Sequence, residues 1–238
     1  MKYFVCVFLL LALTAHADDT DYASARMAML TEVQNYAKLA RDTDDATFND
    51  DVMRALATVE RHEFVPESEK PFAYENHPLP IGHGQTISQP YIVALMTELI
   101  DAKPDDVVLE IGTGSGYQAA ILAKLVNHVY SIEIIEALAD QARERLARLG
   151  YDNVTTKLSD GYYGWEEHAP FDAIVVTAAP SHIPPPLIQQ LKPGGRLVVP
   201  VGGRFMTQQL LLIEKTEDDE IITRQIAAVR FVPLTGKH

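Results

Sequence analysis

The sequence is nearly free of cysteine: the only one, Cys6, lies in an apolar stretch at the N-terminus. With a single thiol, the chain can form neither an internal disulfide nor a cysteine-based metal site. Three histidines, His62, His77 and His83, fall in one region, but no helical i, i+4 spacing relates them. We therefore expect no metal ion.

The sequence also lacks an apolar run long enough to span a bilayer, which takes about 20 residues. The run from Phe4 to Leu13 is much shorter; Lys2 precedes it, and Ala15-His16-Ala17 follows as a small-x-small pattern. This order is typical of a secretory signal peptide. We expect cleavage to remove residues 1–17 and leave a periplasmic, cysteine-free chain with no stable membrane association. A cytoplasmic protein with a retained N-terminus is the alternative.

Basic residues are scarce: 20 Lys and Arg stand against 33 Asp and Glu, and the formal net charge is -13. Such a chain repels phosphate groups, so we expect neither nucleic acid nor anionic lipid as a partner. The 238 residues suit one compact domain with a sizeable core. Nothing in the composition indicates an oligomer, so we expect a monomer.

The first hundred residues contain no repeat and predict helices joined by an irregular segment. Apolar residues recur at helical spacing over 27–40 and 52–59, and residues 61–84 are rich in proline and glycine. Ser88 suits a helix N-cap and Pro90 a first turn, which predicts a helix from there to about Ile100. We treat residues 18–104 as an N-terminal helical segment on the substrate side.

From Asp106 onward, strands and helices alternate. We expect strands at 107–111, 128–134, 154–158, 171–177 and 196–201, helices at 117–126, 136–149 and 187–191, and a final antiparallel pair at 210–214 and 221–232. This alternation predicts a doubly wound, mostly parallel, seven-stranded Rossmann-like α/β sheet with an antiparallel C-terminal pair and an N-terminal helical extension. Residues 105–238 would form the core, in one compact domain with 18–104, and ligands would bind at the carboxyl ends of its strands.

A glycine loop, Gly112-Thr113-Gly114-Ser115-Gly116, follows the first of these strands and opens a helix. Glycine lets the backbone approach a ligand and adopt positive φ. The loop alone could hold NAD, FAD or S-adenosylmethionine, or be a tight structural turn. Its G-x-G-x-G spacing differs from the G-x-G-x-x-G of dinucleotide-binding folds.

Acidic residues stand at three successive strand ends near this loop. Glu110 lies just before the loop, on the strand. Glu133 ends the second strand and suits ribose hydroxyls, and Asp160 with Gly161 comes at the end of the third strand, where an adenine ring would lie. Together with the loop they outline a site for a nucleoside-containing cofactor. The loop spacing and the lack of a Tyr-x-x-x-Lys pair disfavour an NAD-dependent dehydrogenase.

Residues 108–123, VLEIGTGSGYQAAILA, resemble motif I of the class I S-adenosylmethionine-dependent methyltransferases. More narrowly, the chain is similar from about 29 to 236 to the protein-L-isoaspartate O-methyltransferases. The blocks that carry this resemblance, in order, are RHEFVP (61–66), PLPIGHGQTISQPYIVALM (78–96), FDAIVVTAAP (171–180), LKPGGRLVVPVG (191–202) and VRFVPLTG (229–236). The TISQP portion is the discriminating one, because motif I occurs across the whole superfamily.

The resemblance implies a function and a set of site residues. The cofactor would be S-adenosylmethionine, and its methyl group would pass to the carboxylate of L-isoaspartyl (or D-aspartyl) residues in damaged proteins, as a step of protein repair. Ser88 would be the catalytic residue. The implied cofactor-binding residues are Glu110, Gly112, Thr113, Gly114, Gly116, Glu133, Asp160 and Gly161; the implied substrate-binding residues are Thr86, Ile87, Gln89, Pro90 and Thr235.

Two departures from the family pattern stand out. Ser159-Asp160-Gly161 replaces the usual Gly-Asp-Gly, and the family is mostly cytosolic, whereas this chain begins with an export-type segment. Two alternatives stay open at this point: a methyltransferase for a different acceptor, and a non-catalytic exported binding protein with the same fold.

Overall fold

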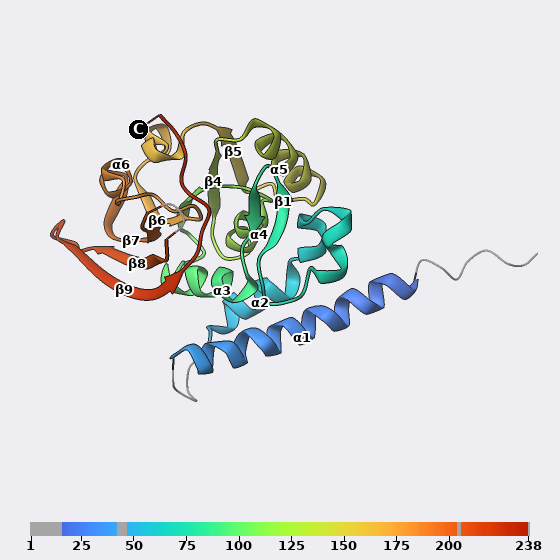
Figure 1. Ribbon diagram of the computed structural model, residues 1–238. Helices are drawn as coiled ribbons and strands as arrows, with labels where there is room; N and C mark the ends of the chain where they lie inside the picture. Colours follow the sequence, from blue (N-terminus) through green and yellow to red (C-terminus); the bar gives the residue numbers. More distant parts are fainter. Residues whose placement is uncertain (1–15, 42–46, 204–205, 238) are drawn as a thin grey trace, which may run out of the picture.

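The computed structural model describes residues 16–41, 47–203 and 206–237. Seven strands form one sheet in the order β5-β4-β3-β6-β7-β8-β9, and two more form a small separate hairpin (Figure 1). Strands β5, β4, β3, β6 and β7 pair in parallel, and β8 and β9 complete the sheet antiparallel. The predicted sheet, with its antiparallel C-terminal pair, is confirmed.

The element bounds follow the predicted alternation closely. The helices are α1 (His16–Arg41), α2 (Asp50–Thr58), α3 (Pro90–Leu99), α4 (Tyr117–Ala123), α5 (Glu136–Arg148) and α6 (Pro185–Gln189). The strands are β1 (Leu79–Gly82), β2 (Gln85–Ile87), β3 (Val107–Ile111), β4 (His128–Glu133), β5 (Val154–Leu158), β6 (Phe171–Val176), β7 (Leu191–Val201), β8 (Gln208–Lys215) and β9 (Ile221–Val229). Most of the expected export segment, residues 1–15, lies outside the described residues.

Two apolar layers lie on either side of the sheet, because successive side chains of a strand point to opposite faces. On β3, Val108 packs into the layer that holds α1 to α5, whereas Leu109 and Ile111 pack into the layer beneath α6. Glu110 alternates with them and faces the first layer. The N-terminal helices therefore share one core with the sheet, and α1 lies along the outside of α2 and α3 (Figure 1).

The segment 61–84, predicted to be irregular, contains short regular elements. It contains two short 3-10 helices, Arg61–Phe64 and Glu67–Phe72, and then β1, which pairs with β2. The turn between them places Gly82, His83 and Gly84 at positive φ, which explains its two glycines. Leu79, Ile81 and Ile87 are buried beneath this hairpin, so its short strands present an apolar face to the core.

The start of α3 differs from the prediction by one residue. Gln89 is the N-cap, and its side chain makes no capping hydrogen bond, so the expectation that Ser88 caps the helix is wrong. Ser88 instead precedes the cap, and its carbonyl oxygen accepts a hydrogen bond from Arg61. The Ser88 side chain is therefore not used to cap α3.

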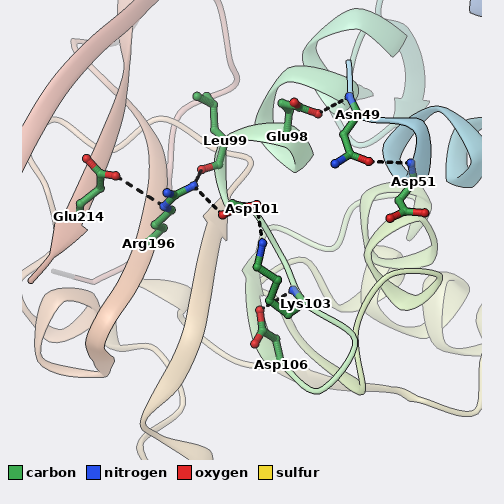
Figure 2. Close-up of polar contacts among 9 residues, drawn as sticks. All are labelled: Asn49, Asp51, Glu98, Leu99, Asp101, Lys103, Asp106, Arg196 and Glu214. Carbon is green, nitrogen blue, oxygen red and sulfur yellow. Dashed lines mark hydrogen bonds and ion pairs between the residues drawn. The ribbon is translucent and has the colours of Figure 1, made fainter. Parts of the chain in front are cut away.

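The far end of α3 is fixed to the sheet by polar contacts (Figure 2). Arg196 on β7 donates to the Leu99 carbonyl at 3.3 Å and also lies near Asp101 and Glu214. Glu98 accepts the backbone N–H of Asn49, the N-cap of α2, at 2.9 Å. These contacts hold α3 in place and with it the segment around Ser88. Within the part of the chain that the structure describes, no helix is long and apolar enough to cross a membrane.

Candidate active site

The glycine loop leaves β3 and enters α4 through three left-handed residues. Gly112, Gly114 and Gly116 have φ of 97°, 52° and 87°, values that residues with a side chain rarely adopt. The N–H groups of Gly112 and Thr113 both donate to the Ile132 carbonyl, at 2.8 and 3.2 Å. A Cβ on Gly112 would lie 2.5 Å from Thr177 Oγ1. The loop therefore runs tightly across the ends of β3, β4 and β6, with no room for a side chain at its first glycine.

Replacing Gly112 by alanine is expected to weaken binding of the cofactor that the sequence resemblance implies, S-adenosylmethionine, roughly 10- to 100-fold, because both strain and the clash with Thr177 displace the loop. Gly150 offers a matched control: it also has positive φ, 75°, but a Cβ there meets nothing within 4 Å. Gly150→Ala should lower stability by about 1 kcal/mol and leave ligand affinity unchanged. Calorimetric titration of both variants checks this, and equal affinities would contradict the account of the loop.

Glu133, at the end of β4, is bound to the loop by its carboxylate. One oxygen accepts the Gly114 N–H at 2.8 Å, and the other accepts the N–H groups of Ile134 and Ile135 at 2.9 and 3.0 Å. The side chain is 6% exposed. Three backbone donors thus fix a carboxylate beside the glycine loop, with one lone pair left for a further donor.

Glu110 is fully buried, at the inner end of a short polar chain. Its Oε2 is hydrogen-bonded to Ser131 Oγ, which in turn contacts Thr113 Oγ1 at 2.6 Å. Among the described residues, Oε1 has no hydrogen-bond partner. Burial raises the pKa of the Glu110 carboxyl to about 8; Ser131 opposes the rise, and the nearby Glu133 adds to it. Near neutral pH, Glu110 is therefore a neutral acid that supports the loop from below.

The raised pKa makes the stability of the protein depend on pH. Between about pH 4.5 and 8, unfolding releases the proton that native Glu110 retains, so the stability contributed by this group falls as pH rises through that range. Glu110→Gln removes this titration. The difference in free energy of unfolding between this variant and the parent should therefore shift in favour of the variant by roughly 1–3 kcal/mol from pH 5 to pH 8. Urea unfolding at several pH values measures it, with the exposed Glu144→Gln as control; a constant difference would argue against a buried neutral Glu110.

Asp160 and Gly161 follow β5, as predicted, but play different parts. Gly161 lies against the glycine-loop strand: a Cβ there would lie 2.4 Å from Ile111 Cγ2. Asp160 accepts the Tyr162 N–H at 3.0 Å and, through its other oxygen, the Lys237 N–H at 3.1 Å. The carboxylate expected at an adenine ring thus also anchors the C-terminal segment.

That C-terminal segment crosses the carboxyl ends of the strands, as the dark red ribbon beyond β9 shows (Figure 1). It is fixed to the loop after β6: the Ala179 N–H donates to the Val232 carbonyl, and the Leu234 N–H donates to the Ala179 carbonyl, both at 2.8 Å. Residues 232–235 form one wall of a cleft above the glycine loop. We call this space the loop cleft.

The loop cleft brings together most of the predicted site residues. Those on its walls are Thr86, Ile87, Ser88, Glu110, Gly112, Thr113, Gly114, Glu133, Gly161 and Thr235. They come from β2, the ends of β3 and β4, the segment after β5 and the C-terminal segment. One cleft therefore collects residues that are up to 149 positions apart in sequence, from Thr86 to Thr235.

Four of the predicted residues do not line this cleft. Gly116 is the N-cap of α4, and a Cβ there would come within 3.3 Å of Leu146, so it serves packing between α4 and α5. Asp160 lies behind Gly161, bound as described above. Pro90 is buried in the first turn of α3. Gln89 lies in a second, neighbouring space.

This second space, which we call the side cavity, has a volume of about 660 Å³ and lies between α1, α3 and the end of β9. Its walls include Tyr36 of α1, Tyr91 of α3 and Phe231 after β9. Four residues line both the side cavity and the loop cleft: Thr86, Ser88, Thr177 and Val232. The two spaces therefore meet at Ser88.

Several residues of the site have no counterpart in the sequence prediction. Tyr117 and Thr177 line the loop cleft, and Val232 with Leu234 closes it from the C-terminal side. The sequence TAAP (177–180) could have indicated Thr177, because a polar residue at the carboxyl end of a buried parallel strand often contacts a ligand. Arg61, which lies behind Ser88, begins the RHEFVP block (61–66), but nothing in that block indicated a role in the site.

Comparison with known proteins adds to this geometry. Residues 35–238 match the family model described as protein-L-isoaspartate(D-aspartate) O-methyltransferase (PCMT). A protein-L-isoaspartate O-methyltransferase 2 of Syntrophobacter fumaroxidans is 60% identical over 237 residues, which cover 98% of this chain and 96% of the relative. A protein-L-isoaspartate O-methyltransferase 1 of Cupriavidus necator is 61% identical over 223 residues, covering 93% and 86%.

Solved structures agree at the level of the whole fold. One protein-L-isoaspartate O-methyltransferase superposes with a TM-score of 0.78 at 29% identity, over 89% of this chain and 66% of its own. A Plasmodium falciparum structure described as a beta-aspartate methyltransferase (PCMT), in complex with S-adenosyl-L-homocysteine, gives 0.73 at 29% identity, over 88% and 98%. The family match over most of the length and the relatives at 60 and 61% identity lead to one conclusion: this chain belongs to the protein-L-isoaspartate(D-aspartate) O-methyltransferase family.

Proposed function

We propose that this protein uses S-adenosylmethionine to methylate the carboxylate of L-isoaspartyl residues in damaged proteins and peptides, and thereby starts their repair. The observation that carries the proposal is the junction of the loop cleft with the side cavity at Ser88. A group transfer between two bound molecules needs two such spaces, and the reacting atoms must meet where the spaces join.

The loop cleft suits the cofactor. Gly112 and Gly161 let the backbone pack directly against Thr177 and Ile111, where a Cβ would clash, so the chain runs close along the floor of the cleft. Glu133 presents a fixed carboxylate to ribose hydroxyls. When bound, S-adenosylmethionine supplies a methyl group carried on a positively charged sulfur.

Ser88 would orient the acceptor. Its hydroxyl can donate a hydrogen bond to a substrate carboxylate, and its place directly before α3 puts that carboxylate near the positive end of a helix dipole. An α-carboxylate is already ionised near pH 7, so the reaction needs no general base. Consistent with this, the four described residues shared by the two spaces carry no basic side chain. The chain contributes positioning and exclusion of water.

The side cavity favours a peptide as the acceptor. Its volume of about 660 Å³ leaves room for the residues that flank an isoaspartyl carboxylate, and its lining mixes aromatic, aliphatic and polar side chains. When the carboxylate of an isoaspartyl residue reaches Ser88, the neighbouring residues of the peptide would lie along α3 and the end of β9. The binding roles of Thr86, Ile87, Gln89 and Thr235 belong to this proposal.

Conversion of an isoaspartyl peptide into its aspartyl form tests the function. The peptide is incubated with the protein and S-adenosylmethionine, and both forms are followed by chromatography. We expect the isoaspartyl form to fall and the aspartyl form to rise only when the cofactor is present, because a methyl ester closes to a succinimide that reopens partly to aspartate. No conversion, with cofactor binding intact, would refute the repair function.

We further propose that the protein is exported and acts as a monomer without nucleic acid. Lys2, the apolar run 4–13 and the small-x-small pattern ending at Ala17 support export, and the net charge of -13 disfavours nucleic acid. N-terminal sequencing of the protein from fractionated Gram-negative cells should find Asp18 as the first residue, in the periplasm. An intact N-terminus in the cytosol would contradict it.

A further inference from the structure

Arg61 is buried in an unusual way. It is the largest of the fully buried side chains that the structure describes, with an exposed fraction of 0%. It lies at the start of the first 3-10 helix. Burial lowers the pKa of its guanidinium to about 10, and Tyr117 opposes the fall, so the side chain stays cationic near pH 7. The protein thus holds a positive charge in its interior.

The guanidinium joins three segments of the site. Its Nε donates to the Ala73 carbonyl at 2.8 Å, and one terminal nitrogen donates to the Ser88 carbonyl at 2.7 Å. Its central carbon lies 4.8 Å from the ring centroid of Tyr117, the first residue of α4 and part of the loop cleft. One planar group therefore lies between the Ser88 segment and α4, the helix that follows the glycine loop, and sets the spacing between them.

Among the residues that the structure describes, none supplies a counter-charge to this arginine. The other terminal nitrogen, Nη1, has no hydrogen-bond partner, and no carboxylate pairs with the guanidinium, within the described parts of the chain. An unpaired buried charge is costly, and an apolar side chain of similar size would fill the space at less expense. Packing alone therefore does not account for an arginine here.

We propose that Arg61 is a positioning residue for the acceptor: it fixes the Ser88 main chain and places a constant positive charge behind the point where the substrate carboxylate binds. This inference rests on the proposed function. The bond from Ser88 to Gln89 is trans, so the Gln89 N–H points away from Arg61. A charged donor on the Ser88 carbonyl polarises that peptide group and makes the N–H a stronger donor. The effect favours an anionic acceptor and disfavours a cationic group, so it does not serve to bind the cofactor.

A second arginine, Arg145, makes a similar bond on the cofactor side of the site. Arg145 on α5 donates to the Ser115 carbonyl at 2.8 Å and so supports the glycine loop instead of the Ser88 segment. Substitution of Arg145 should act on the cofactor side, whereas substitution of Arg61 should act on the acceptor side. The exposed Arg54, which pairs with Asp51 on α2, serves as the neutral control.

The test compares Arg61→Lys, Arg61→Gln, Arg145→Lys and Arg54→Lys in the full chain. Three quantities are measured: the Kd of S-adenosylhomocysteine, the KM of an isoaspartyl peptide, and kcat per S-adenosylhomocysteine-binding site, which counts folded molecules only. For Arg61→Lys we expect the peptide kcat/KM to fall about 10- to 100-fold while the Kd changes by less than about twofold, because lysine keeps the charge but cannot bridge two carbonyls. Arg145→Lys should raise the Kd, and Arg54→Lys should change nothing.

Three results would overturn the inference. In the first, the peptide kcat/KM of Arg61→Lys stays within twofold of the parent. In the second, all three quantities worsen together. In the third, neither Arg61 variant binds S-adenosylhomocysteine, which would assign the residue to general stability. A parent protein that binds S-adenosylhomocysteine but methylates no isoaspartyl peptide would instead be a failure of the proposed function, and this inference would fall with it.

Discussion

Replacing Glu133 by alanine is expected to weaken S-adenosylhomocysteine binding by about 100- to 1,000-fold. The change removes the acceptor of three backbone N–H groups, those of Gly114, Ile134 and Ile135, and the carboxylate proposed to hold the ribose. Hydrogen bonds to a charged group contribute about 1.5–3 kcal/mol each, so the loss of the one bond left for the ligand, together with the loop support that Gly114 loses, accounts for an effect of this size. Calorimetric titration measures it directly.

Two variants separate the ribose contact from general damage at the end of β4. Glu133→Gln keeps one acceptor oxygen and should fall between the parent and the alanine variant. Glu136→Ala removes an exposed carboxylate from the first turn of α5 and should bind the ligand like the parent. Parent-like affinity in Glu133→Ala would show that the ligand does not use this carboxylate.

Replacing Ser88 by alanine is expected to lower kcat/KM for an isoaspartyl peptide by about 10- to 100-fold, which corresponds to the loss of one charge-assisted hydrogen bond. Because Ser88 lines both the loop cleft and the side cavity, its hydroxyl acts where the acceptor meets the cofactor. It is not the α3 cap, so the helix should keep its stability. Steady-state kinetics and thermal unfolding of the variant check both points.

The control for Ser88 is Ser68→Ala, which removes an exposed hydroxyl that contacts only Glu69 among the described residues. It should change neither the rate nor the melting temperature. S-adenosylhomocysteine affinity in Ser88→Ala should stay within about twofold of the parent. An unchanged kcat/KM in Ser88→Ala would remove the serine from the reaction.

The sheet could be predicted from the sequence because its signals are local. Strands buried on both faces, such as β3 and β6, appear as short apolar runs, and a glycine after β3 marks the turn into α4. The strand ends then fix where Glu110, Glu133 and Asp160 must lie, since parallel strands end at the same edge. This reasoning placed most of the loop cleft.

The rest of the site depends on contacts between residues that are far apart in the chain. Arg61 meets the Ser88 carbonyl across 27 positions, and Lys237 meets Asp160 across 77. No spacing rule connects such pairs. The side cavity likewise exists only because α1 and the end of β9 meet beside α3. The β1–β2 hairpin was missed because its strands are only four and three residues long and because Pro80 and Gly82 interrupt the alternation of β1.

The measurement that tests the central claim most directly is methyl transfer to matched peptides. Methyl-labelled S-adenosylmethionine and the chain from Asp18 onward are combined with an equimolar mixture of three peptides. The peptides are identical except for an isoaspartyl residue, a normal aspartyl residue, or an isoaspartyl residue whose α-carboxylate is amidated. Base-labile label on the first peptide alone is the predicted result. Label on all three or on none, with the cofactor bound, would contradict the account of Ser88 and the side cavity as an isoaspartyl carboxylate site.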